Sequence, residues 1–235
     1  MEFGDGTVVL DKHRKEADPF VIPVAKIFKN WNPNTISWIG LIIALLSGAC
    51  FVFSSPLSIA GSDVWTADWL LLVGAGLVLL SGFFDTLDGK VAKMFNKCTK
   101  KGDYLDHVFD RYADLFMIGG IAISTWCNPV LGMVAISGVL LTSYMGTQAQ
   151  AIGGVRLYSG LLGRADRVIL TTIFPIIQFI FLYAFNGDIS SIQFDLGSIH
   201  VSMTWMEIMM LYFAIVGHFT AVQRAIIIWK NMPDE

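Results

Sequence analysis

Long apolar stretches, separated by short polar segments, dominate the chain. A helix needs about 20 apolar residues to cross ~30 Å of hydrocarbon, and six stretches reach or approach that length. They are expected at about residues 36–53, 65–95, 103–126, 130–152, 164–185 and 203–229. Membrane β-strands would instead produce short alternating segments. The pattern therefore predicts an all-α integral membrane fold with six transmembrane helices.

An amphipathic segment precedes the first stretch. Over residues 12–31, apolar residues recur at helical spacing among basic ones, which is typical of a helix that lies in the membrane interface. Pro19 and Pro23 are expected to fix its start or to bend it. We therefore expect residues 1–31 to form a tail and an N-terminal interfacial helix, and residues 32–235 to form one membrane domain.

Turn chemistry indicates where two of the helices begin and end. Pro33-Asn34-Thr35 predicts a helix start, with Asn34 or Thr35 as the cap. The second stretch is too long for one crossing, so its end is expected to protrude from the bilayer. A short basic turn, residues 96–101, follows it and closes at Gly102.

The distribution of charge predicts an orientation in the membrane. Only 15% of the residues are charged, against about 25% in soluble domains. All 16 Lys and Arg residues fall on one side of the six-span arrangement, and the loops 54–64 and 186–200 on the other side have none. This asymmetry predicts a multi-pass protein of the cell membrane with both termini in the cytoplasm. Anionic ligands are then expected at the cytoplasmic face, and nucleic acid is not expected as a partner.

Four aspartates lie near the connection between the second and third spans. Asp85 and Asp88 are spaced i,i+3, and Asp106 and Asp110 are spaced i,i+4, so each pair projects from one face of its helix. The short connection makes the two helices antiparallel neighbours, and a rise of ~1.5 Å per residue puts both pairs at a similar depth. Carboxylates gathered within a membrane are costly. They must be protonated, paired with Arg or Lys, or bound to metal.

Bound metal is the interpretation that the residue types favour. Lys90, Lys93 and Arg111 are the basic residues close in sequence, too few for four carboxylates if they also serve substrates. Oxygen ligands without His or Cys favour Mg²⁺, Mn²⁺ or Ca²⁺, and such sites suit phosphate chemistry. The structural alternative is that the aspartates are solvated or cap helix ends. Two pairs on adjacent helices argue against it.

Small residues flank these aspartates, and the whole pattern resembles a known signature. Small residues allow close helix packing, or the approach of a base and a pyrophosphate to the backbone. The pattern reads Asp85-x-x-Asp88-Gly89-x-x-Ala92-Lys93, then eight residues, then Gly102-x-x-x-Asp106-x-x-x-Asp110. It resembles the signature of the CDP-alcohol phosphotransferases. That family usually has Arg at the position of Lys93, and Lys keeps the charge but loses the bidentate fork.

The resemblance covers nearly the whole chain and implies a role for each of these residues. It implies a homodimer and an enzyme that transfers a phosphate-linked group from a CDP-activated lipid to an alcohol. The implied cofactor is Mg²⁺ or Mn²⁺, as two ions, held by Asp85, Asp88, Asp106 and Asp110. Asp110 is also the implied catalytic base. The implied nucleotide and pyrophosphate contacts are Asp85, Asp88, Gly89, Ala92, Lys93 and Gly102.

Arginines after the fourth span are candidates for the acceptor site. Arg164 and Arg167 share a helix face near a helix N-terminus, and both features favour a phosphate monoester. The structural alternative is that they anchor the helix at the cytoplasmic surface, and Arg164 could instead pair with Asp166 or a glutamate. Residues 143–151, with the Arg-Ala-Asp-Arg at 164–167, resemble the inositol-phosphate branch of the family. This implies that Arg167 and Arg224 bind the acceptor phosphate, and the further candidates are Arg156 and Arg164.

The expected reaction is transfer of a phosphatidyl or archaetidyl group to a phosphorylated polyol, myo-inositol 1-phosphate, with release of CMP. Bacterial inositol-phosphate members have a Lys and an Arg within the stretch that here reads Gly146-Thr147-Gln148. Glycerol phosphate, serine or a CDP-inositol donor therefore stay open as alternatives. A divalent-cation channel or transporter would also place aspartates along a pathway, but no comparable polar residues continue to the far side.

Overall fold

The computed structural model describes residues 18–54, 57–59, 62–65, 67–152, 160–184, 192–196 and 199–232. Five helices in this part of the chain are long and apolar enough to cross a membrane. Helix α4 (Lys100–Ile123) is as long, but the charged residues of its first half leave it outside that set. The helical fold class is thus confirmed, with five candidate spans. These are α2 (Pro33–Phe53), α3 (Leu70–Met94), α5 (Pro129–Ala151), α6 (Arg164–Ala184) and α7 (Trp205–Asn231).

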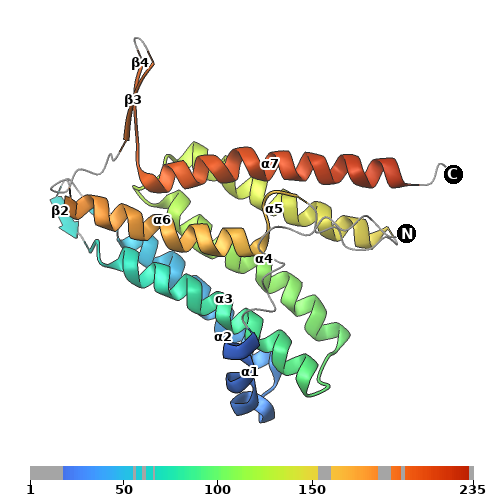
Figure 1. Ribbon diagram of the computed structural model, residues 1–235. Coiled ribbons are helices and arrows are strands. Elements are labelled where there is room, and N and C mark those ends of the chain that lie inside the picture. Colours follow the sequence, from blue (N-terminus) through green and yellow to red (C-terminus); the bar gives the residue numbers. More distant parts are fainter. Residues whose placement is uncertain are drawn as a thin grey trace.

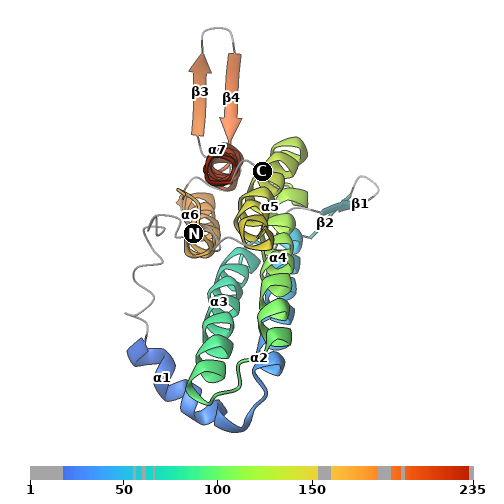
Figure 2. The ribbon, with the colours of Figure 1, turned by 90° about the vertical axis from the view of Figure 1, so that its right-hand side faces the viewer.

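The long helices form two groups that diverge at one end of the molecule. Helices α3 and α4 both pack on α2, and α4 also contacts α5 (Figures 1 and 2). Helix α5 packs along α7, and α6 contacts both α3 and α7. In Figure 1, the ends of α3 and α4 that meet at their short connection extend away from α5, α6 and α7. The facing sides of α3, α4 and α6 are therefore the natural place for a cavity.

A short helix supports α3 at that end. Helix α1 (Asp18–Ile27) is followed by the 3-10 turn η2 (Phe28–Asn30), and both lie within the predicted N-terminal helix. Residues 1–17, which include the predicted tail, lie outside the described part of the chain. One face of α1 is buried against α3 by four apolar residues: Val21, Ala25, Leu87 and Val91.

Two helix starts differ from the predicted ones. The side chain of Asn32 accepts a hydrogen bond from the backbone N–H of Asn34 at 3.0 Å and caps α2. The prediction of Asn34 or Thr35 as the cap is wrong because Pro33 takes the first helical position, where no N–H is needed. Helix α4 begins at Lys100, so Gly102 lies in its first turn rather than at the end of the preceding turn.

Two β-hairpins occupy the connections at the opposite end. Strand β1 (Leu57–Ile59) pairs antiparallel with β2 (Ser62–Trp65), and β3 (Ile192–Leu196) pairs antiparallel with β4 (Ile199–Met203). The predicted start of the second span near Trp65 is therefore wrong, because that residue ends a strand and α3 begins at Leu70. The second hairpin lies largely within the loop predicted over residues 186–200, and it extends to Met203, just before α7.

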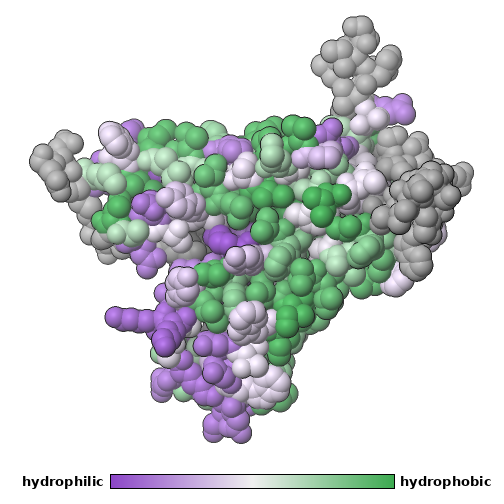
Figure 3. Space-filling model, turned by 180° about the vertical axis from the view of Figure 1, so that it is seen from behind, coloured by the Kyte–Doolittle hydropathy of each residue, from purple (hydrophilic) through white to green (hydrophobic). Residues whose placement is uncertain are grey.

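The surface separates an apolar flank from a hydrophilic end. Figure 3 shows apolar side chains over much of the helical surface, and hydrophilic ones at the end that carries the α3–α4 connection and in the hollow beside it. Exposed aliphatic side chains that suit contact with lipid include Leu45, Leu46, Val134, Ile180 and Ile215. The hollow gives polar ligands a way to reach the helices without crossing the apolar flank.

Glycines set the distance between α2 and α4, and substituting one of them should destabilise the fold. A Cβ at Gly48 would lie 2.1 Å from the carbonyl oxygen of Phe116. We expect Gly48→Ala to lower the free energy of unfolding by about 1–3 kcal/mol, as overpacking does. The thermal unfolding midpoint of the detergent-solubilised protein measures the effect. Gly76→Ala is the matched control, because a Cβ there would meet no atom within 4 Å. Equal midpoints for the two variants would contradict the close approach.

Candidate active site

A cavity of about 680 Å³ lies between the two groups of helices, with residues of α2, α3, α4, α6 and α7 in its wall. It contains every predicted site residue that the structure describes. Arg156, the remaining candidate for the acceptor phosphate, lies outside the described residues. The predicted residues that line the cavity are Asp85, Asp88, Gly89, Ala92, Lys93, Gly102, Asp106, Asp110, Arg164, Arg167 and Arg224.

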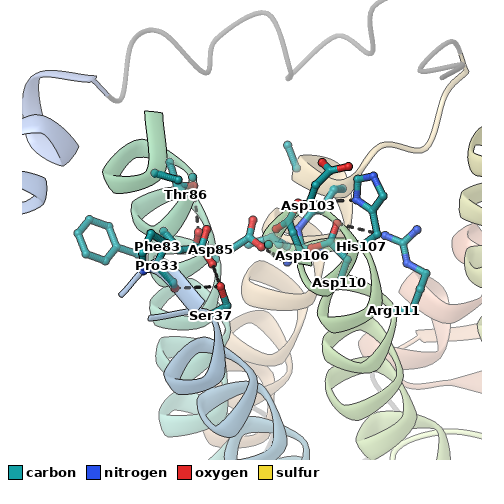
Figure 4. A pocket seen from close by; sticks show the side chains of 18 of the residues that line it. Pro33, Ser37, Phe83, Asp85, Thr86, Asp103, Asp106, His107, Asp110 and Arg111 are labelled. Atoms are coloured by element: carbon teal, nitrogen blue, oxygen red, sulfur yellow. Dashed lines mark hydrogen bonds and ion pairs between the residues drawn. The ribbon is translucent and has the colours of Figure 1, made fainter. Parts of the chain in front are cut away.

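Three of the four predicted aspartates converge at the centre of the cavity. Asp85 of α3 and Asp106 and Asp110 of α4 each offer an oxygen, and these three oxygens lie within 4.8 Å of one another. Figure 4 shows Asp85 facing the other two across the gap between α3 and α4. The i,i+4 spacing of Asp106 and Asp110 places both on one face of α4, and their carboxylates approach Asp85 of α3. We refer to Asp85, Asp106 and Asp110 as the acidic trio.

Asp88, the fourth predicted aspartate, lies beside the trio rather than within it. Its carboxylate accepts a hydrogen bond from the hydroxyl of Ser37 on α2. Asp88 is only 5% exposed, so this bond compensates a group that has lost most of its contact with water. Sequence reasoning missed Ser37 because nothing in the pattern of α2 indicates which of its polar residues faces α3.

An arginine from a distant part of the chain reaches the acidic trio. Nη2 of Arg164, at the start of α6, lies 3.1 Å from Oδ1 of Asp85, and its Nη1 contacts Oδ1 of Asp110. The alternative pairing of Arg164 with Asp166 does not occur in the structure, where Asp166 accepts a hydrogen bond from the backbone N–H of Gly163 at 2.7 Å. Pairing with arginine therefore neutralises part of the trio.

A second ionic cluster adjoins the trio one helical turn further along α4. The carboxylate of Asp114 is 2% exposed, and its Oδ2 lies 3.2 Å from Nη2 of Arg167 on α6 and 3.8 Å from Nη2 of Arg111. Arg167 also donates to the hydroxyl of Ser143 on α5 at 3.1 Å. Sequence reasoning missed Asp114, although it continues the i,i+4 spacing of Asp106 and Asp110. We refer to Arg111, Asp114, Arg167 and Ser143 as the arginine cluster.

Arg224 of α7 completes this side of the cavity. It is 6% exposed, and its Nη1 donates to the backbone oxygen of Thr142 on α5 at 2.6 Å. Three helices thus bring cationic side chains to one wall, because Arg111 lies on α4, Arg167 on α6 and Arg224 on α7. Helix α5 supplies the acceptors, the hydroxyl of Ser143 and the backbone oxygen of Thr142. The predicted arginines 164, 167 and 224 are brought together, although Arg164 faces the trio.

The residues present fit a hard divalent cation. Three carboxylates on two helices supply oxygen ligands alone, which is the chemistry that Mg²⁺ and Mn²⁺ prefer. The cavity leaves room for further oxygen ligands from a substrate. Arg164 binds two of the same carboxylates, so a cation bound there would compete with this guanidinium.

The apolar helices and the acidic cavity define the class, a multi-pass membrane protein with a polar site between its helices. The sequence profile of the family described as CDP-alcohol phosphatidyltransferase matches residues 30–216. The chain therefore belongs to the CDP-alcohol phosphatidyltransferase family and is a membrane transferase of phospholipid synthesis. Membership of this family argues against the alternative function of a divalent-cation channel or transporter.

Curated relatives and solved structures agree with this assignment. The chain is 28% identical over 162 residues to an archaetidylinositol phosphate synthase of Methanothermobacter thermautotrophicus, covering 69% of this chain and 72% of that protein. It is 26% identical to a phosphatidylinositol phosphate synthase of Cutibacterium acnes, covering 83% and 84%. The phosphatidylinositol phosphate synthase of Mycobacterium tuberculosis in apo form shares the fold, with a TM-score of 0.65 at 20% identity over 91% of this chain and 99% of that one. The structure of that protein in complex with manganese and citrate gives a TM-score of 0.64, covering 89% and 88%.

Proposed function

We propose that the protein transfers a phosphatidyl or archaetidyl group from a CDP-activated lipid to a phosphorylated polyol, myo-inositol 1-phosphate, and releases CMP. The observation that carries the proposal is that the acidic trio and the arginine cluster adjoin in one cavity. Carboxylates that suit a metal-bound pyrophosphate and arginines that suit a phosphate monoester are the two sites that this reaction needs. The similarity to inositol phosphate synthases favours the inositol acceptor.

The nucleotide end of the cavity is assigned to the last turns of α3 and the first turn of α4. Asp85, Asp88, Gly89, Ala92, Lys93 and Gly102, the predicted contacts, all line it. A Cβ at Gly89 would meet no atom within 4 Å, so packing does not require a glycine there. Its absent side chain instead leaves room in the cavity for the CDP group.

The acceptor end is assigned to the wall that carries Arg167 and Arg224, with Arg164 between it and the trio. Arg167 is 4% exposed, and its Nε has no hydrogen-bond partner among the described residues. A buried N–H without an acceptor is unfavourable, and a phosphate oxygen would satisfy it. Arg156 stays a candidate for the same phosphate.

Asp110 is assigned as the base that removes the proton from the acceptor hydroxyl. Asp110 is the member of the trio that adjoins the arginine cluster, because its Oδ1 contacts Arg164 and its Oδ2 lies 3.5 Å from Nη2 of Arg111. An acceptor held by Arg167 would present its hydroxyl near this carboxylate, within reach of general base catalysis. Bound Mg²⁺ or Mn²⁺, as two ions held by Asp85, Asp88, Asp106 and Asp110, would polarise the pyrophosphate and neutralise the leaving CMP.

The same proposal includes the arrangement in the membrane. Helix α4 is the sixth span, with its charged first half lining the cavity instead of facing lipid. The end that carries the α3–α4 connection faces the cytoplasm, and so do both termini. Helix α1 lies in the interface, and the protein is a homodimer, as its family resemblance implies.

The test is CMP release by the purified protein with CDP-archaeol or CDP-diacylglycerol, Mg²⁺ or Mn²⁺, and one acceptor at a time. We expect myo-inositol 1-phosphate to give the highest kcat/KM, with glycerol 3-phosphate, free inositol and serine as comparisons. A preference for glycerol phosphate would reassign the acceptor and keep the reaction. A preference for serine or free inositol would refute the role of the arginine cluster as a phosphate site.

Cysteine labelling tests which end of the cavity holds the nucleotide. Cys98 is exposed and lines the cavity beside Lys97 and Thr99, whereas burial raises the pKa of the Cys127 thiol to about 12. At pH 7.5 a water-soluble maleimide should therefore label Cys98 and leave Cys127 unreacted, because the thiolate is the nucleophile. Saturating CDP-lipid should slow the labelling of Cys98 about fivefold or more by shielding it.

Mass spectrometry of the two cysteine peptides measures both rates, and Cys127 serves as the internal control for unfolding. If the nucleotide end lies elsewhere in the cavity, CDP-lipid will leave the rate at Cys98 unchanged. Labelling of Cys127 at a similar rate would instead indicate that the protein had opened.

A further inference from the structure

Asp114 takes no part in the reaction proposed above, although it is among the most deeply buried charged groups of the site. It is 2% exposed, compared with 5% for Asp88 and 7% for Asp110. A carboxylate at such a position is tolerated only where cations compensate its lost hydration. The two arginines that contact Asp114 indicate which groups this carboxylate stabilises.

Asp114 joins two arginines from different helices through one oxygen atom. Its Oδ2 lies 3.2 Å from Nη2 of Arg167 and 3.8 Å from Nη2 of Arg111. Nη1 of Arg167 is bound in turn to Ser143 at 3.1 Å. Both terminal nitrogens of Arg167 are thereby engaged, while its Nε has no hydrogen-bond partner among the described residues. The guanidinium is fixed at one side and available at the other.

We propose that Asp114 is a positioning residue for the acceptor phosphate, a role that rests on the proposed function of Arg167. Two guanidiniums beside one another repel, and a carboxylate between them allows both to stay close to the cavity. Asp114 also fixes the plane of the Arg167 guanidinium, and a fixed plane favours directional hydrogen bonds to phosphate. It touches no substrate and acts through Arg167.

This role predicts a specific split in the kinetics. Asp114→Asn keeps the shape and removes the charge, so we expect the KM for the phosphorylated acceptor to rise about tenfold or more, while kcat and the KM for CDP-lipid change less than about threefold. Asp114→Glu keeps the charge on a longer side chain and should give a smaller rise in acceptor KM. Thermal unfolding of each variant is measured in the same detergent.

A double-mutant cycle with Arg167→Ala distinguishes this inference from the function on which it rests. In the Arg167→Ala background, Asp114→Asn should raise the acceptor KM no further, because its effect passes through that arginine. Additive effects would overturn the positioning role. If Arg167→Ala leaves the acceptor KM unchanged, the proposed acceptor site itself is refuted.

If Arg167→Ala raises the acceptor KM and Asp114→Asn does not, the acceptor site stands and the inference about Asp114 falls. A general structural role would raise both KM values together and lower the unfolding midpoint, which would also overturn it. If Asp114→Asn is not recovered as folded protein, Asp114→Glu must show the same result, a rise in the acceptor KM without a matching rise in the KM for CDP-lipid. An unchanged ratio of the two KM values in that variant would then refute the proposal.

Discussion

Asp110→Asn is expected to lower the rate of CMP release by about 1,000-fold while the protein stays folded, since a positioned base contributes roughly 10²–10⁴ to a rate. The amide has nearly the same shape but cannot accept the proton of the acceptor hydroxyl. The fold should persist because Arg164 keeps its contact with Asp85, and Arg111 keeps its contact with Asp114.

The measurement is kcat with saturating CDP-lipid and acceptor, together with the thermal unfolding midpoint. Asp68→Asn is the matched control, because it makes the same substitution next to the other end of α3, outside the cavity lining, and should leave kcat within about twofold. A residual kcat above about a tenth of the kcat of the unsubstituted protein would exclude Asp110 as the base.

The helices could be predicted from the sequence because their signal is continuous and strong. Apolar runs such as those of α2 and α6 need no partner to be recognised. The boundaries were less predictable where a few residues decide them. Pro33 fits a helix start equally well before or within the first turn. Trp65 precedes an apolar run as a helix start would, but it ends β2 and pairs with Leu57 of β1.

The acidic trio was predictable because its spacing is local. Asp106 and Asp110 must share a face of α4 whatever surrounds them, and the short connection brings Asp85 beside them. The position of Asp88 was not predictable, because it depends on Ser37 from a helix 51 residues away in the chain. Spacing along α3 cannot distinguish a carboxylate in the trio from one beside it.

The arginines show the same limit. The sequence predicts that Arg164 and Arg167 share one helix face and that both bind the acceptor phosphate. It contains no signal for how α6 packs against α3 and α4. In the structure, three residues of separation along α6 are enough to place Arg164 on the acidic trio and Arg167 on Asp114. Packing angles between distant helices, which side-chain periodicity does not encode, decide this difference.

Arg164→Gln is expected to raise the affinity of the protein for Mn²⁺ by about tenfold or more. A tenfold change in affinity corresponds to ~1.4 kcal/mol of binding free energy. In the structure, this arginine engages Asp85 and Asp110, two of the three carboxylates that suit a cation. Removing its charge frees both carboxylates and removes a repelling cation. Binding is measured by the electron paramagnetic resonance signal of free Mn²⁺ in a titration, which needs no turnover.

Arg164→Lys is the matched control for this effect, because it keeps a positive charge near the carboxylates and should bind Mn²⁺ within about threefold of the unsubstituted protein. The Mn²⁺-free Gln variant should also unfold at a lower temperature, because the trio loses its compensating charge. The opposite outcome, weaker Mn²⁺ binding in Arg164→Gln than in Arg164→Lys, would mean that Arg164 supports the cation site. We expect tighter Mn²⁺ binding in Arg164→Gln because the guanidinium and the metal ion compete for the trio. The same carboxylates cannot be fully bound by both at once.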